Sequence, residues 1–221
     1  MRRPFAVIAA GAAVGVAVIA VIVFTHQVLP ADVEVEDYVQ STNWGPLALT
    51  FPIFTWIGDI KGFFIEAIVF VAILLFNRRA WLTTLACAAS GAWYFTLSHF
   101  LIRVRPTTHY VLRVTEHPGA SSFPSGHTIF VATLVTVLML CFGHRFLPRW
   151  ALPIGWALAA LTVLACAISR VYSGAHWPTD VLAAILIAVA WLSFVISVRR
   201  VSDPVLRPEQ DQQETKHQAA A

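Results

Sequence analysis

The stretch FAVIAAGAAVGVAVIAVIVF, residues 5–24, decides the fold class of this chain because it is apolar throughout. An α-helix of about 20 residues reaches about 30 Å, which is the thickness of the hydrocarbon core of a bilayer. Arg2 and Arg3 precede the stretch, as in a signal peptide, but no cleavage site of small residues follows it. The sequence therefore predicts an uncleaved membrane anchor.

The composition of the whole chain agrees with a membrane protein. Of its 221 residues, 58% are hydrophobic and only 12% are charged, whereas soluble domains carry about 25% charged residues. The net charge of +3 is small, and the basic residues lie mostly at predicted membrane boundaries, so we expect no nucleic-acid partner. We expect a polytopic protein with one core, in contact with the lipid bilayer.

Five further apolar segments can each cross the membrane as a helix. They are residues 62–76, 81–102, 127–142, 150–168 and 178–198. The predicted fold class is therefore all-α, a bundle of six transmembrane helices. Residues 25–61 hold acids and prolines, so we expect an exterior loop there with a short interfacial helix, and a solvated face for the acids at positions 32–37.

The charges at the ends of these spans predict the orientation. With the N-terminus in the cytoplasm, ten of the 15 lysines and arginines fall on cytoplasmic segments, as the positive-inside rule requires. Both termini are then cytoplasmic in a multi-pass protein of the cell membrane. Residues 1–200 would form the membrane-embedded domain, and the polar residues 201–221 a disordered cytoplasmic tail.

Three polar fragments, at residues 105–106, 124–127 and 169–180, fall at predicted helix ends on the same exterior face. A charge at the bilayer centre costs about 2.5–3.5 kcal/mol, so we expect the three fragments to share a wet pocket at that face. Their arginines, histidines, hydroxyl, glycine and carboxylate suit phosphate ester chemistry.

The second fragment has the form of a helix start, because Pro124, Ser125 and Gly126 precede a long apolar run. The side chain of Ser125 can cap that helix, and the N–H groups of its first turn, at the positive end of the dipole, form an anion site. Gly126 lets the backbone approach a phosphate closely, and His127 would project from the rim.

The third fragment places His176 and Asp180 four residues apart, so that on a helical turn they share one face. A carboxylate that accepts the proton of one imidazole nitrogen fixes the tautomer and leaves the other nitrogen free to attack. We expect His176 to be the nucleophile, and His127 the general acid toward the leaving oxygen and then the base toward water. Arg105 and Arg170 would bind phosphate oxygens bidentately, so we expect neither a metal nor a cofactor.

The three fragments together resemble the signature of the type-2 phosphatidic acid phosphatase superfamily. They read Arg-Pro at 105–106, Pro-Ser-Gly-His at 124–127 and Ser-Arg-x5-His-x3-Asp at 169–180, and the similarity spans about residues 50–200. Members with six helices are integral-membrane lipid phosphatases that work without metal through a phosphohistidine. The resemblance implies His176 as nucleophile, Asp180 as its partner and His127 as acid. It also implies that phosphate is held by Arg105, Ser125, Gly126 and Arg170.

One position departs from the family pattern. The first fragment usually begins with a lysine seven residues before the arginine of Arg-Pro, and here that position is Ser98. Arg103, two residues before Arg105, or Lys61, at the outer end of the second span, could supply the missing cation as an accessory phosphate ligand.

Two substrate classes fit a membrane lipid phosphatase of this kind, and the sequence does not separate them. One is a polyprenyl carrier such as undecaprenyl pyrophosphate. The other is a glycerophospholipid phosphate such as phosphatidic acid or phosphatidylglycerol phosphate. The partners are then a lipid phosphate and the bilayer.

Other classes of function are open at this point. An intramembrane serine protease could use Ser125 and His176, although Arg105 and Arg170 argue against it. A zinc site could draw on the histidines at 109, 117, 127 and 176, but the tight spacing of metal ligands is missing. A catalytically impaired transporter or scaffold is the third alternative.

Overall fold

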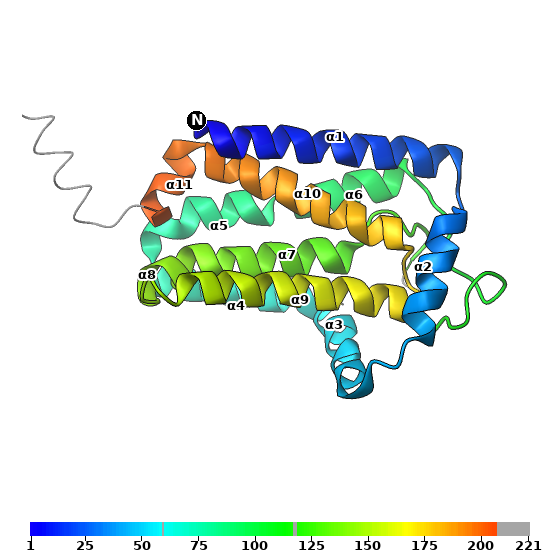
Figure 1. Ribbon diagram of the computed structural model, residues 1–221. Helices are drawn as coiled ribbons and strands as arrows, with labels where there is room; N and C mark the ends of the chain where they lie inside the picture. Colours follow the sequence, from blue (N-terminus) through cyan, green and yellow to red (C-terminus); the bar gives the residue numbers. More distant parts are fainter. Residues whose placement is uncertain (59, 117–118, 207–221) are drawn as a thin grey trace, which may run out of the picture.

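The structure is a computed structural model that describes residues 1–58, 60–116 and 119–206. Within these ranges every regular element is a helix, as the sequence predicts for a chain built from apolar spans. Figure 1 shows the long helices side by side, with the short helix α2 (Pro30–Ser41) lying across one end of the bundle.

Four helices of the described chain are long and apolar enough to cross a membrane. They are α1 (Arg3–Thr25), α9 (Leu152–Tyr172), α10 (Pro178–Ser197) and the run Gly126–Phe146. That run is built from α7 (Gly126–Leu138), the π-helical turn η3 (Met139–Gly143) and α8 (His144–Phe146). These elements confirm the first, fourth, fifth and sixth predicted spans as apolar helices. The helix α1 packs along α10, and α7 packs against both α9 and α10 (Figure 1).

The other two predicted spans are shorter. The second becomes α4 (Ile60–Phe76), which follows α3 (Phe51–Gly58). The third is not one helix over residues 81–102, as predicted, but two helices, α5 (Trp81–Ala88) and α6 (Gly91–Phe100). The break falls at Ser90, whose hydroxyl lies 2.6 Å from the hydroxyl of Thr133 on α7. The hydrogen bond between this hydroxyl and a neighbouring helix favours a break at this point, and so does the low helix propensity of the following residue, Gly91.

The helix α9 continues one turn beyond its predicted end at residue 168. Ser169 and Arg170 therefore lie on the last helical turn rather than in a loop, and both side chains are buried. The turn after α9 depends on Gly174, which has a φ of +68°. A Cβ on Gly174 would lie 2.2 Å from the carbonyl oxygen of Arg113, so this glycine allows the loop before α7 to approach the α9–α10 turn closely.

The predicted disordered tail does not begin at residue 201. Residues Arg199–Leu206 form the helix α11, and Val201, Val205 and Leu206 pack against a core cluster of buried residues. Arg2 and Asp203 form an ion pair of 2.8 Å that ties the start of the chain to this helix. The correction has a physical reason, because the apolar side of a short amphipathic helix is buried. The rest of the predicted tail, residues 207–221, lies outside the described residues.

The polar fragments meet at the end of the bundle where α2 lies. The first turn of α7, the last turn of α9 and the first turn of α10 all lie at this end, which we call the site end (Figure 1).

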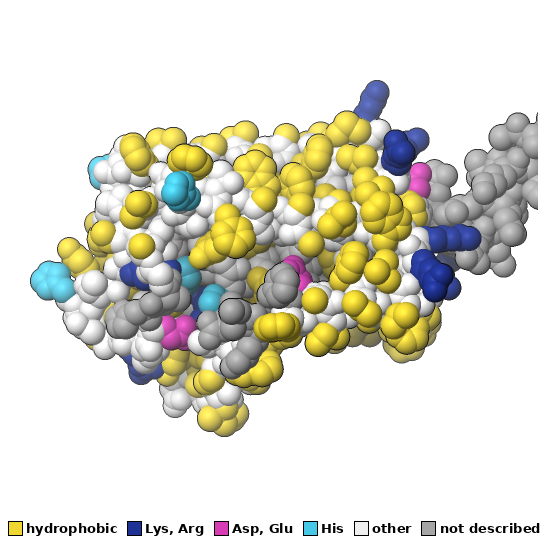
Figure 2. Space-filling model, turned by 180° about the vertical axis from the view of Figure 1, so that it is seen from behind, with side chains coloured by type: hydrophobic (Ala, Val, Ile, Leu, Met, Phe, Trp, Pro, Cys, Tyr) yellow, Lys and Arg dark blue, Asp and Glu magenta, His cyan; other side chains and the backbone are white. Residues whose placement is uncertain are grey.

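The predicted exterior loop also lies at the site end, and it is more helical than expected. It contains α2, η1 (Gly45–Thr50) and α3. Basic side chains gather at the opposite end, whereas histidines lie together with basic and acidic side chains at the site end (Figure 2). At that opposite end, η2 (Arg78–Ala80) connects α4 to α5.

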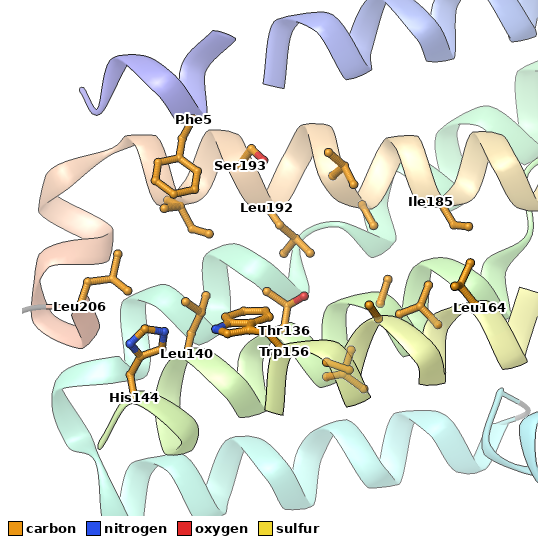
Figure 3. A pocket seen from close by; sticks show the side chains of 18 of the residues that line it. Phe5, Thr136, Leu140, His144, Trp156, Leu164, Ile185, Leu192, Ser193 and Leu206 are labelled. Atoms are coloured by element: carbon orange, nitrogen blue, oxygen red, sulfur yellow. The ribbon is translucent and has the colours of Figure 1, made fainter. Parts of the chain in front are cut away.

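A large apolar cavity runs between α7, α9 and α10. Its volume is about 790 Å³. Figure 3 shows its lining, from Leu164 and Ile185 at one limit to His144 and Leu206 at the other. None of the predicted site residues lines this cavity, which lies in the apolar part of the bundle.

Candidate active site

His176 is held in a single orientation by a backbone carbonyl. It lies between α9 and α10 with only 3% of its side chain exposed, and its Nδ1 is 2.6 Å from the carbonyl oxygen of Ser122. The carboxylate of Asp180, the predicted partner, is 4.0 Å from Nδ1. A carbonyl oxygen only accepts hydrogen bonds, so Nδ1 carries the proton and Nε2 holds the free lone pair. The carbonyl of Ser122, and not the predicted carboxylate of Asp180, accepts the hydrogen bond from Nδ1.

The electrostatic surroundings of His176 bring the three fragments together. Burial lowers the pKa of His176 well below its usual value of 6.5, and the positive charges of Arg105, His127 and Arg170 lower the pKa further. Hydrogen bonds place the three fragments together, because the guanidinium of Arg105 donates to the carbonyl of Ala175, which precedes His176, and the N–H of Ser125 lies 3.3 Å from the carbonyl oxygen of Asp180. The ring is neutral near neutral pH, which is the protonation state that a nucleophile needs.

Asp180 organises the start of α10. Its Oδ2 accepts a hydrogen bond of 2.9 Å from the backbone N–H of Trp177, which caps the helix. Its Oδ1 lies 2.6 Å from Nη1 of Arg103, and the whole carboxylate is buried. Because Trp177 directly follows His176, the acid positions His176 through the backbone.

Arg103 is a buried structural cation. Its side chain is 1% exposed, and Nη2 lies 2.6 Å from Oδ2 of Asp32 on α2. The remaining donors reach the hydroxyl of Thr179 at 2.7 Å, the carbonyl of Gln27 at 3.0 Å and Asp180. Four of the five N–H donors of Arg103 are therefore bonded within the protein, and this buried position does not suit the accessory phosphate role that the sequence suggested. The other candidate, Lys61, has a side chain outside the described residues.

The helix α2 carries a buried polar face made of Asp32, Glu36 and Gln40. The three side chains are spaced by four residues and are 1%, 0% and 4% exposed. Two of them are acids that the sequence assigned to a solvated face. These acids are buried and not solvated because α2 lies across the site end, where polar partners are available. Gln40 pairs with both the N–H and the carbonyl of Arg113, at 2.7 and 2.9 Å.

Arg105 is held by backbone carbonyls, one of which belongs to Ala175, the residue before His176. Its guanidinium donates to the carbonyl oxygens of Gly119, Ser121 and Ala175, and so links the loop before α7 to the residue that precedes His176. Burial lowers the pKa of Arg105, and negative charge, most of all that of Asp180, opposes this shift. The guanidinium remains a cation within the site.

Arg170 projects from the last turn of α9 and is 1% exposed. Its Nη1 lies 2.8 Å from Oε2 of Glu116, and its Nη2 donates to the hydroxyl of Thr55 at 2.6 Å. The same hydroxyl donates to Oε1 of Glu116 at 2.7 Å. The guanidinium of Arg170 is thus paired with a carboxylate.

The first turn of α7, where the sequence predicts an anion site, differs from the prediction in two ways. Ser125 is the N-cap residue, but its side chain makes no capping bond to the backbone. Its hydroxyl accepts a hydrogen bond of 3.0 Å from Thr128 instead. Gly126 is needed for packing as well, because a Cβ there would lie 2.9 Å from the ring of Tyr94. The half-buried His127 follows directly.

Sequence reasoning missed five residues around this site. They are Asp32, Tyr94, Glu116, Ser122 and Thr179. Only Asp32 left a signal, since its spacing of four residues from Glu36 and of eight from Gln40 predicts a polar helical face. The others act through contacts between distant segments.

The geometry agrees with the match to a known family. The model of the PAP2 superfamily matches residues 79–203, which is more than half of the chain. The chain belongs to the PAP2 superfamily. The matched range includes every residue of the three polar fragments.

Curated relatives in the PAP2 superfamily share part of the chain. An undecaprenyl-diphosphatase of Sulfolobus acidocaldarius is 35% identical over 107 residues, which are 48% of this chain and 45% of that protein. Phosphatidylglycerophosphatase B of Haemophilus influenzae is 39% identical over 89 residues, 39% of this chain and 35% of that protein. The chain thus spans less than half the length of these two relatives.

Solved structures share the fold over a longer range. A PAP2-type phosphatidylglycerolphosphate phosphatase from Bacillus subtilis superposes with a TM-score of 0.69 at 20% identity, covering 86% of this chain and 94% of that one. LpxE of Aquifex aeolicus superposes with a TM-score of 0.60 at 21% identity, covering 79% and 98%. These likenesses show that the helical arrangement is that of PAP2 membrane phosphatases.

Two alternative functions find no support in the described part of the chain. Ser125 and His176 are bonded to other partners, Thr128 and the Ser122 carbonyl, and not to each other as a serine protease needs. No three His, Cys, Asp or Glu side chains come together there as metal ligands. Of the histidines in the zinc alternative, His117 lies outside the described residues.

Removing Arg103 should destabilise the protein strongly. Arg103→Ala leaves the buried carboxylates of Asp32 and Asp180 without their cation, and breaking a buried ion pair costs about 3–5 kcal/mol. The matched control is Arg113→Ala, which removes a half-buried arginine of the same loop that lies 4.3 Å above the ring of Tyr172, a contact worth about 0.5–1 kcal/mol. Thermal unfolding in detergent measures both variants. Equal losses would contradict a special role for Arg103.

Glu36 should make the protein less stable as the pH rises. Burial, with the nearby charges of Asp32, Asp180 and Asp37, raises the pKa of Glu36 from 4.5 to about 9. Between these two values the folded protein binds a proton that the unfolded chain does not, so stability is full below pH 4.5 and falls as the pH rises toward 9.

The test of this linkage is Glu36→Gln, which keeps the shape and removes the titration. We expect a higher unfolding midpoint at pH 8 and a flatter dependence of the midpoint on pH. The control is Glu34→Gln on the exposed side of α2, which should leave both unchanged. An unchanged pH dependence in Glu36→Gln would show that the folded protein holds no extra proton on this acid.

Proposed function

We propose that this protein is a membrane lipid phosphatase that works through a phosphohistidine at Nε2 of His176. One observation carries the proposal. A buried imidazole whose Nδ1 is bonded to the Ser122 carbonyl keeps Nε2 for attack, and the guanidinium of Arg105 reaches the carbonyl of the preceding residue, Ala175. A nucleophile beside a cation suits attack on an anionic phosphoryl group.

The reaction proceeds in two steps on these residues. In the first, Nε2 of His176 bonds to phosphorus, the bond from phosphorus to the leaving oxygen breaks, and His127 gives that oxygen a proton. In the second, His127 takes a proton from a water molecule, whose oxygen bonds to phosphorus while the P–N bond breaks. Inorganic phosphate leaves, and His176 regains its neutral form with the Nδ1 proton in place.

Phosphate binding in both steps falls to Arg105, Arg170 and the start of α7. The backbone N–H groups after Ser125 lie at the positive end of the helix dipole, and Gly126 keeps side-chain atoms away from them. These donors supply the positive field without a metal ion or a cofactor.

The lipid nature of the substrate is supported by the apolar cavity between α9 and α10. Leu164 lines one end of this cavity and lies six residues before Arg170 on α9. Six residues span about 9 Å along a helix. The cavity then extends away from the site end as far as Leu206. A hydrocarbon chain attached to a phosphate in the site would find apolar space beneath it. Both substrate classes, a polyprenyl diphosphate and a glycerophospholipid phosphate, have relatives whose names specify them.

The membrane topology belongs to the same proposal. The four long helices, together with α4 and the pair α5–α6, would form six membrane spans. Six spans place both ends of the chain in the cytoplasm and the site end at the exterior face. The gathering of arginines at the opposite end supports this orientation (Figure 2).

Phosphate release in detergent tests the chemistry. With a chelator present, the purified protein should release phosphate from at least one of undecaprenyl diphosphate, phosphatidic acid and phosphatidylglycerol phosphate. His176→Ala should reduce the rate to background, because no other group can accept the phosphoryl group. His99→Ala, on the exposed side of α6, is the control and should keep full activity. Unchanged release in His176→Ala would refute the phosphohistidine.

Thiol labelling in intact cells tests the orientation. The native cysteines Cys87, Cys141 and Cys166 are all buried and should give little background. A membrane-impermeant thiol reagent should label Glu34→Cys at the site end and leave Arg149→Cys unlabelled until the cells are permeabilised. The reverse pattern would place the site at the cytoplasmic face.

A further inference from the structure

The ring of Tyr94 lies against the first residue of α7. Tyr94 belongs to α6 and is half-buried. A Cβ on Gly126 would lie 2.9 Å from Cε2 of the Tyr94 ring and 3.2 Å from its Cζ. Each Cα–Cβ bond of an α-helix tilts toward the N-terminus of the helix. The ring therefore occupies the space beside the N-terminal end of α7.

The phenol oxygen of Tyr94 is bonded to Cζ, so it also lies close to the start of α7. The backbone N–H groups of the first helical turn point toward this same end, where an anion binds. The ring itself is anchored, because it packs against the buried cluster of Ile129, Ala184 and Ile187. No hydrogen bond joins the phenol oxygen to another residue of the described ranges. A phenol O–H is a donor, and that of Tyr94 is available to a ligand.

Tyr94 lies one helical turn before Ser98, the position at which the family pattern has a lysine. Residues four apart share one face of a helix, so the two side chains are on the same side of α6. The hydroxyl of Ser98 donates to the carbonyl of Phe95 within its own helix, at 3.4 Å. Arg103 is engaged in buried ion pairs. Tyr94 is thus the donor that α6 brings to the start of α7.

We propose that Tyr94 is a phosphate ligand, whose phenol O–H donates to an oxygen of the lipid phosphate at the start of α7. The proposal rests on the proposed function, and it deepens that function by adding a neutral donor to the two arginines and the helix N–H groups. A hydrogen bond to an ionised oxygen is about twice as strong as one between neutral groups. Tyr94 therefore tightens phosphate binding without adding a charge. Gly126 makes room for it, since a side chain there would displace the ring.

The test is Tyr94→Phe, which keeps the ring and removes only the hydroxyl. The substrate is whichever of the three lipid phosphates the unaltered protein hydrolyses fastest in detergent micelles. We expect kcat/KM to fall about tenfold, the change that corresponds to about 1.4 kcal/mol. The inhibition constant of inorganic phosphate should rise by a similar factor, because phosphate alone occupies the same donors. The unfolding midpoint should stay unchanged, since the ring and its packing are kept.

Two further variants separate a lost donor from a general change. Tyr38→Phe is the matched control, because it removes the same hydroxyl from a residue of α2 that is 72% exposed. It should leave kcat/KM and phosphate inhibition unchanged. Ser98→Lys, added to Tyr94→Phe, places three N–H donors on the same face of α6. It should recover most of the lost kcat/KM and of the lost phosphate affinity.

The outcomes distinguish this inference from the proposed function. If the unaltered protein releases phosphate from none of the lipid phosphates, the proposed function fails. If it releases phosphate and Tyr94→Phe keeps both its kcat/KM and its inhibition constant for phosphate, Tyr94 is not a ligand. A fall in kcat/KM with unchanged phosphate inhibition would also overturn the inference, because Tyr94 would then serve only the packing of α6 on α7.

Discussion

The buried ion pairs of Arg103 are the constraint on which the rest of the site depends. One guanidinium joins Asp32 on α2 to Asp180 at the start of α10, with all three side chains nearly inaccessible to water. Charges buried in this way must stay paired, since an unpaired buried charge costs several kcal/mol. The positions of α2 and α10 are therefore fixed relative to each other. His176, which lies four residues before Asp180, is positioned with them.

The two arginines of the polar fragments are held by bonds within the protein. Arg105 donates to backbone carbonyls, and Arg170 pairs with Glu116. Such bonding fixes the positions of the guanidinium groups, and a pre-organised group loses less entropy when it binds a ligand.

Sequence reasoning succeeded where one segment carries the information. The apolar spans at residues 5–24 and 178–198 appear as α1 and α10, and the three polar fragments meet near His176. It failed where two segments share an interaction. The break at Ser90 depends on a hydroxyl of α7, and the partner of His176 is a carbonyl from the loop before α7. Neither partner can be inferred from local spacing.

The sequence by itself determined that the chain is a helical membrane protein, because long apolar runs leave the backbone no other way to satisfy its hydrogen bonds in lipid. It also predicted which polar residues gather at one end of the bundle, because charged and imidazole groups are too costly to lie within the hydrocarbon core. Only the tertiary structure decided which groups pair. Asp180 binds Arg103 rather than His176, and the acids of α2 are buried rather than solvated. Pairing depends on distances of a few ångströms between segments far apart in the chain, and local sequence patterns do not encode those distances.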